Sequence, residues 1–448
     1  MTLNDFMPQT LLRKVRLFTR KLWVRVILMG LLAFVALGLT QLAEIFVPEK
    51  LARSLSGASA DRLLDIIANA MLAVTIFSLT MMVSVYRSSS AQFTPRFHRL
   101  IIQDRTTQNT LATFIGAYVY ALLGIILRET GVYVDDRAFV LFATTVLVLA
   151  IIVIYLVRWV LHLQTFGSLI ETTRQIEEVT RQNFVERLQT PCLGAVPLTD
   201  GIPQECTTVL APESGYVQHI YPEALQAAAE AHGMEVYLVS NIGSFVHLNE
   251  PLAQVRERGP RTEKEQDYET FEKAVLANVV LGDVRTYDQD PRFGLIVLGE
   301  IGSKALSPGV NDPGTAIDVI TRVGRILSCY KDETRAETAG DVLDRLFVPP
   351  LDPGDLLEDG FGALTRDGQT LVEVQERLQS TLASLMKHPD RKLAKVARVA
   401  AKVALQRALS AMDFERDRDR LENSVEAALL QETVKDRNVE PGARAEAT

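Results

Sequence analysis

The feature that most constrains this chain is a set of four long apolar runs within its first 165 residues. Each run approaches or exceeds the length that a helix needs to cross a bilayer core of about 30 Å at about 1.5 Å per residue, and the third is the shortest. A helix also satisfies its own backbone hydrogen bonds in lipid. The sequence therefore predicts four transmembrane helices, at residues 26–47, 66–86, 111–127 and 138–160.

The first run has a rival interpretation as a cleaved signal peptide. Six Lys and Arg residues precede it between positions 13 and 25. The run is longer than the apolar region of a typical signal peptide, about 7–15 residues, and no small-residue cleavage site follows it. We therefore expect a retained span.

The distribution of Lys and Arg predicts the orientation of the spans. The N-terminus, the loop after the second span and the residue Arg158 carry eleven basic residues, against five in the two loops on the opposite side. Basic residues accumulate on the cytoplasmic side. Both termini are expected in the cytoplasm.

Charge divides the chain into a basic, apolar part and an acidic part. Residues 1–165 hold 16 Lys and Arg against 9 Asp and Glu, whereas the remainder holds 31 against 46. An acidic soluble region argues against a nucleic-acid partner, because phosphate contacts need clustered basic residues. Three cysteines without metal-ligand spacing indicate a reducing compartment without disulfides.

The second span carries one polar stripe. At 100° per residue its members fall on one side of a helix, and in a bilayer such a stripe must face protein or water. Two interpretations are open: hydrogen bonding to a neighbouring helix, or the lining of a pore with Arg87 at its cytoplasmic mouth. The candidate pore-lining residues are Asn69, Ile76, Thr80, Ser84 and Arg87.

The three later spans have no Asp, Glu, Lys, Arg or His in their central turns. Ion-coupled transporters and proton relays usually place such groups at mid-membrane. The pattern disfavours an energised transporter but leaves a channel possible, because hydroxyls and backbone can line a pore. Between spans two and three, basic and apolar residues alternate from Pro95 onward, which predicts a helix at the headgroup surface or a membrane-hugging loop.

The part after residue 165 is expected to contain a small β module among helices. Short β patterns at 215–220 and 234–239 flank an Ala-rich helix at 222–232. The spacing of Gly, Val and Pro-Leu in 211–255 is similar to half of a barrel-sandwich hybrid domain of the biotinyl or lipoyl type. This segment has no lysine, so covalent attachment of such a cofactor is not expected, and no cofactor is predicted.

The densest local chemistry lies at 288–321, where two expected helices meet at a Ser-Pro-Gly-Val-Asn-Asp-Pro-Gly corner. Asp312 is expected to cap the second helix, with Pro313 at its first position. A polar hub is predicted there, either as a structural network or as a site for a small ligand or ion. Its residues are Arg285, Asp290, Lys304, Asn311 and Asp312.

No catalytic or metal-binding residues are predicted. Ser303 and Ser307 have no His close in sequence, and the six His residues have no metal-ligand spacing. In the helical part that is expected from residue 262 onward, the first helix is expected at 271–281; it is apolar and contains Asn278. The segment 346–354 is expected to be a rigid loop.

Three segments together carry a family resemblance: SSSAQFTPR, RTYDQDPRFGL and EIGSKALSPGVNDPGTA. They resemble a bacterial family known as predicted membrane proteins of the DUF2254 type, over about residues 20–410. The resemblance implies a multi-span membrane part and a cytosolic domain, and it carries no established activity. We expect the protein to lie in a bacterial inner membrane.

The expected fold class is a four-helix transmembrane part followed by an α+β cytosolic domain. The best functional hypothesis is a homo-oligomeric ion channel or pore gated by that domain; the alternative is a membrane-anchored sensor or scaffold that binds a small ligand or protein. An unrecognised enzyme is disfavoured. The expected segments are a basic N-terminus (1–25), the spans (26–165), a linker (166–210), the β module (211–258), a helical domain (259–435) and a disordered tail (436–448).

Overall fold

The computed structural model describes residues 23–24, 27, 31, 34, 38, 57–92, 96, 104–130, 138–165, 168–258, 265–335 and 342–425. The chain divides into two compact units, Met1–Glu171 and Thr172–Thr448. Several expected features lie wholly or largely outside the described residues: the basic N-terminus, the span at 26–47, the surface helix near Pro95 and the tail after 435.

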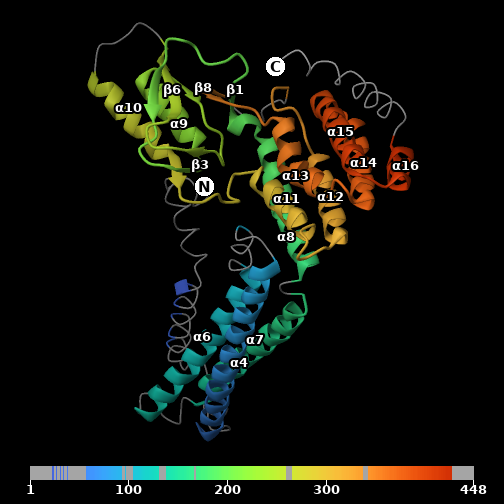
Figure 1. Cartoon of the computed structure of the whole chain (residues 1–448). Helices are drawn as coiled ribbons and strands as arrows, with labels where there is room; N and C mark the ends of the chain where they lie inside the picture. Colours follow the sequence, from blue (N-terminus) through green and yellow to red (C-terminus); the bar gives the residue numbers. More distant parts are fainter. Residues whose placement is uncertain are drawn as a thin grey trace, which may run out of the picture. The chain divides into compact units, whose positions relative to one another are not determined.

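Three helices of the first unit are long and apolar enough to cross a membrane. They are α4 (Gly57–Gln92), α6 (Arg105–Glu129) and α7 (Ala138–Leu163), drawn in blue to green in Figure 1. Helix α6 is longer than the expected span at 111–127. Its start is fixed by Asp104, whose carboxylate accepts a hydrogen bond from the backbone N–H of Thr107 at 2.7 Å.

One apolar core holds these three helices together. The face of α4 that contains Leu64 and Ile67 packs with Phe114 of α6 and with Leu141 and Trp159 of α7, all of them at most 2% exposed. Gly124 of α6 allows close approach, because a Cβ there would lie 3.0 Å from the Leu64 side chain. Small and apolar side chains therefore bring α4 and α6 into contact.

The second unit opens with α8 (Leu169–Gln189), which contains the boundary between the units, and a 3₁₀ turn, η4 (Pro191–Gly194). Two β-sheets follow. The larger has the strand order β1-β8-β4-β6-β2 and the smaller β5-β3-β7. The strands are β1 (Ala195–Pro197), β2 (Thr207–Leu210), β3 (Gly215–Ile220), β4 (Met234–Leu238), β5 (Phe245–Val246), β6 (Pro251–Glu257), β7 (Val279–Gly282) and β8 (Leu343–Val348).

The sheets take strands from beyond the expected module at 211–258. Strand β8 pairs in parallel with both β1 and β4, although its last three residues fall in the segment expected to form a loop at 346–354. The helix expected at 271–281 is also corrected: α10 (Glu265–Asn278) ends at Asn278, and the next four residues pair with β3 as β7. The β-branched Val279 and Val280 favour the strand. Helix α9 (Pro222–His232) forms where the sequence predicts it.

The rest of the second unit is a group of helices, drawn in yellow to red in Figure 1. Each of α12, α13 and α15 starts at an Asp whose side chain accepts backbone hydrogen bonds, and α12 and α13 have Pro at the first helical position. The helices are α11 (Phe293–Ala305), α12 (Pro313–Leu327), α13 (Pro353–Asp367), α14 (Val372–Met386), α15 (Arg391–Ala411) and α16 (Glu415–Ser424).

Candidate functional site

The polar stripe of α4 lies on the exposed side of that helix. Asn69, Ile76, Thr80, Ser84 and Arg87 are all exposed in the chain. At 100° per residue, this side is opposite to the one that packs on α6 and α7. The structure therefore brings the five predicted residues onto one face, and the described parts of α6 and α7 do not cover it.

Part of the polarity of this stripe is satisfied within α4 itself. The Asn69 side-chain amide donates to the Asp65 carbonyl at 3.0 Å, and the Thr80 hydroxyl donates to the Ile76 carbonyl at 2.9 Å. Such bonds lower the cost of holding these groups in an apolar environment. They also leave the outer side of the hydroxyl oxygen available as an acceptor for water or a partner.

Polar contacts join α6 to its neighbours at three depths of the first unit. Arg128 near the end of α6 forms a two-pronged pair with Asp61 of α4, with both N–O distances 2.8 Å. In the middle, the Tyr120 hydroxyl lies 3.2 and 3.1 Å from the hydroxyls of Thr144 and Thr145 on α7. The mutual register of the three helices is thus specified by side-chain chemistry as well as by apolar packing.

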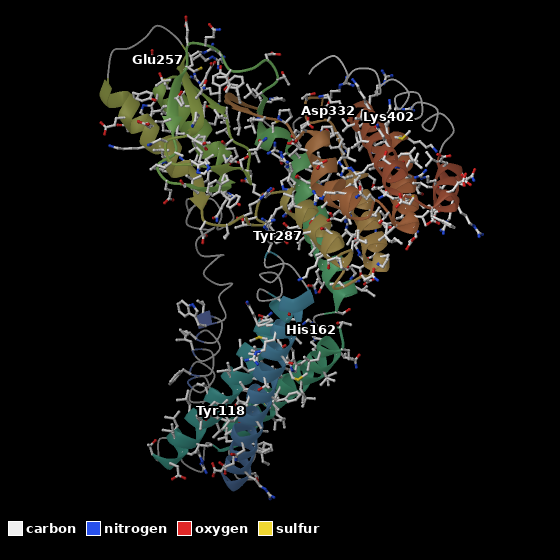
Figure 2. The ribbon with its side chains drawn as sticks, in the orientation of Figure 1. Tyr118, His162, Glu257, Tyr287, Asp332 and Lys402 are labelled. Atoms are coloured by element: carbon white, nitrogen blue, oxygen red, sulfur yellow. The ribbon has the colours of Figure 1, made fainter. Side chains whose placement is uncertain are left out.

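A further contact lies at the opposite end of α6. Nε2 of His162, labelled in Figure 2, lies 3.0 Å from an Asp104 oxygen and 3.2 Å from the Thr107 hydroxyl. Both the imidazole and the carboxylate are largely shielded, with side-chain exposures of 16% and 15%. This pair ties the last turn of α7 to the first turn of α6.

In the second unit, the predicted corner between two helices is present. Asp312 caps α12: its Oδ1 accepts from the Thr315 backbone N–H at 3.1 Å and its Oδ2 from the Thr315 hydroxyl at 2.5 Å. These two hydrogen bonds lower the pKa of the Asp312 carboxyl. Asn311 adopts a left-handed backbone conformation with φ of 49°, which Asn tolerates better than most residues. The sequence identified both the cap and the turn.

Asp290 forms a second polar centre before α11. Its carboxylate accepts from Arg285 Nε at 2.8 Å and from the backbone N–H groups of Arg292 and Phe293 at 3.0 and 3.1 Å. The side chain is 2% exposed, and burial raises its pKa, while Arg285 and the two N–H groups oppose that rise. Gly243 lies against this carboxylate. A Cβ at that position would be 2.2 Å from Asp290 Oδ2, so a side chain there would collide with it.

The five predicted hub residues therefore occupy two places. Arg285 and Asp290 lie before the start of α11, and Lys304, Asn311 and Asp312 lie at its other end. The 13 residues of α11 separate the two groups by about 20 Å at about 1.5 Å per residue. The first is a buried ion pair that starts a helix, and the second is a helix cap.

Sequence reasoning missed the most buried ion pair in the described part of the second unit. Arg187 of α8 donates to Glu333 through Nε at 2.6 Å and Nη2 at 3.2 Å, with side-chain exposures of 6% and 0%. Glu333 also accepts from the backbone N–H of Cys192 at 2.9 Å and of Leu351 at 2.6 Å. A signal existed: Arg187 continues the i, i+4, i+7 face of α8 that buries Thr180 and Phe184.

Two side chains that could take part in metal or nucleophile chemistry, Cys192 and His219, lie in the described part of the second unit. No group of three or more His, Cys, Asp or Glu there could hold a metal ion. Cys192 is fully buried, and burial together with the Glu333 carboxylate raises its pKa to about 12, so its thiol is not activated. His219 is half-buried, and its Nδ1 lies 3.6 Å from an Asp288 carboxylate oxygen.

Comparison with known proteins adds a family but no activity. The family model described as "Predicted membrane protein (DUF2254)" matches residues 19–384. Uncharacterized proteins of Mycobacterium bovis (strain ATCC BAA-935 / AF2122/97) and Mycobacterium tuberculosis (strain ATCC 25618 / H37Rv) are each 28% identical over 358 residues. The matches cover 77% of this chain and 66% of each relative. No solved structure matches.

Proposed function

This chain belongs to the DUF2254 family of predicted membrane proteins, and we propose that it assembles into a homo-oligomeric pore for small ions, gated by its second unit. In this proposal it lies in the bacterial inner membrane with four spans, the first at 26–47, and both termini are cytoplasmic. The segments 166–210, 211–258 and 259–435 form the linker, the β module and the helical domain of the gating part.

The observation that carries the proposal is the position of the α4 stripe. Its residues lie on the side of α4 that faces away from α6 and α7, within a helix long and apolar enough to span a bilayer. Contact with lipid tails leaves polar side chains without water or protein partners. A second copy of the chain, packed around a water-filled axis, supplies both.

Small hydroxyl and amide side chains suit such a lining. Thr80 and Ser84 offer hydroxyl oxygens to a passing ion without trapping it, and Arg87 sets the charge at one mouth of the pore. The lipid bilayer and further copies of the chain are the partners that this assembly requires.

The test combines flux with accessibility. Purified protein in liposomes is expected to pass small ions, and a water-soluble thiol reagent is expected to reduce the flux of Thr80→Cys and Ser84→Cys. Leu79→Cys is the matched control, because Leu79 is 48% exposed but lies about 100° around the helix from Thr80. The proposal fails if reconstituted protein conducts under no voltage, tension or ligand, or if all three variants respond alike.

A protein that never conducts would favour the second hypothesis, a membrane-anchored sensor or scaffold. In that case the polar residues at the two ends of α11 are the first candidates for a ligand or partner contact. Thermal-shift measurements with anions, nucleotides and divalent cations would detect it, and a flat response would count against it.

A further inference from the structure

A hollow of about 890 Å³ lies in the second unit, lined by none of the residues of the proposed pore or of the corner between α11 and α12. Its walls come from α8 and from α12 with the residues just after it. The residues that matter for its chemistry are Arg174, Glu177 and Arg181 from α8, and Arg322, Arg325 and Cys329 from the α12 side.

The arginines are arranged on two facing helices at one-turn or two-turn spacing. Arg174 and Arg181 are seven residues apart on α8, and Arg322 and Arg325 are three apart on α12. At 3.6 residues per turn, each pair shares one face of its helix. Four arginines from two helices therefore line one volume.

Glu177 holds the α12 guanidinium groups in place. One of its oxygens, Oε2, accepts from Arg322 Nη1 at 2.7 Å and from Arg325 Nη2 at 2.9 Å. Arg322 is further fixed by Asp318, which accepts from its Nε at 2.6 Å. Arg322 is buried, whereas Arg325 keeps 58% of its side chain exposed. The α12 side of the hollow therefore combines a buried, ion-paired arginine with an exposed one.

Arginines outnumber carboxylates among the residues that line this volume. Four arginines line it, against the carboxylates of Glu177 and Glu178, and the Asp318 carboxylate outside the lining pairs with Arg322. The distance from Arg181 Nη2 to a Glu178 carboxylate oxygen is 3.4 Å, and the two side chains are 49% and 53% exposed. Solvent therefore screens this ion pair. The volume also falls in the range of small-molecule pockets, about 300–1,000 Å³.

We propose that this hollow binds a phosphate-bearing ligand, either the headgroup of an anionic lipid or a soluble phosphate compound. Arginine suits this chemistry because its planar fork donates two parallel hydrogen bonds to phosphate oxygens. Such a ligand links α8, the first helix after the last span, to α12. The binding of this ligand does not depend on ion conduction, so the result of the pore experiment neither supports nor excludes it.

The experiment uses Cys329 as a reporter within the site. Its half-buried thiol lines the hollow, whereas the half-buried Cys206 lies outside it and the buried Cys192 reports whether the chain stays folded. The full chain is alkylated in phosphatidylcholine nanodiscs with or without pyrophosphate, and in nanodiscs of equal phosphatidylcholine and phosphatidylglycerol. Mass spectrometry gives the rate at each thiol.

We expect the ligand to slow alkylation of Cys329 and not of Cys206. Slowing by pyrophosphate identifies a soluble phosphate compound, and slowing only in phosphatidylglycerol identifies a lipid headgroup. The variant Arg174→Gln/Arg181→Gln is expected to need about tenfold or more ligand for the same protection, because charge-assisted hydrogen bonds are lost. The matched control Arg377→Gln/Arg407→Gln removes two exposed arginines outside the hollow and is expected to behave as the parent.

Two results would overturn the proposal. In the first, neither probe slows Cys329 relative to Cys206. In the second, the ligand protects Cys329 to the same degree in Arg174→Gln/Arg181→Gln and in Arg377→Gln/Arg407→Gln, while Cys192 stays unreactive in both variants.

Discussion

Replacing Glu333 by Gln tests how much one buried carboxylate stabilises the second unit. The Glu333 side chain is fully buried and neutralises Arg187, which is 6% exposed. The substituted amide keeps the shape but leaves the guanidinium without a counter-charge. Removing one partner of a buried ion pair costs about 3–5 kcal/mol.

The thiol of Cys192 measures this cost directly. The Cys192 backbone N–H donates to Glu333 at 2.9 Å, and its side chain is fully buried. An alkylating reagent reaches it only when this junction opens, so the labelling rate follows the opening equilibrium. At about 1.4 kcal/mol per factor of ten, Glu333→Gln is expected to accelerate labelling by about 10²- to 10⁴-fold.

A matched control separates the buried pair from a general effect of losing one carboxylate. Glu269 of α10 pairs with Lys273 at 2.7 Å on the surface, where both side chains are more than half exposed. Glu269→Gln is expected to leave the Cys192 rate within a factor of about two. Equal rates for Glu333→Gln and the parent would refute the reasoning, because they would mean that the pair contributes nothing to closure.

Three further perturbations follow from local geometry. Asp312→Ala should lower the stability of α12, measured by hydrogen exchange, by about 1 kcal/mol. The pKa of Asp312 is lower in the folded protein than in the unfolded chain. The stability that its charge contributes is therefore fully present above the unfolded pKa of about 3.9 and is lost as pH falls through the folded pKa. Gly243→Ala should destabilise by more than about 1 kcal/mol, because φ is 84° and the new Cβ meets Asp290, and equal thermal stability would contradict this. Tyr120→Phe should lower the stability of the first unit in detergent by about 0.6–1.7 kcal/mol, whereas Tyr118→Phe serves as its control.

Local signals account for the parts that the sequence predicts. The long apolar runs identified the three described spans, and the Asp312-Pro313 pair identified the start of α12 because capping depends on adjacent residues. The polar stripe of α4 follows from helical periodicity alone. These features need no knowledge of distant parts of the chain.

Pairings between distant residues explain what the sequence did not predict. Strand β8 joins β1 across about 150 residues, so its short apolar pattern next to Pro349 looked like a loop. Glu333 lies 146 residues from Arg187, and Arg322 lies 145 from Glu177. The hub residues near Asp290 and Asp312 are close in sequence, but helix α11 lies between them and holds them apart.

Two polar side-chain contacts at opposite ends of α6 restrict how the first unit can move. Arg128 binds Asp61 on α4 through two bonds, and Asp104 binds His162 on α7 at the other end. Sliding of α6 along its axis by one helical turn, about 5.4 Å, would break both pairs at once. Tilting or rotation of the three helices as one body breaks neither. Any conformational change in this unit is therefore expected to move the three helices together, and α6 is not expected to slide along its axis relative to α4 and α7.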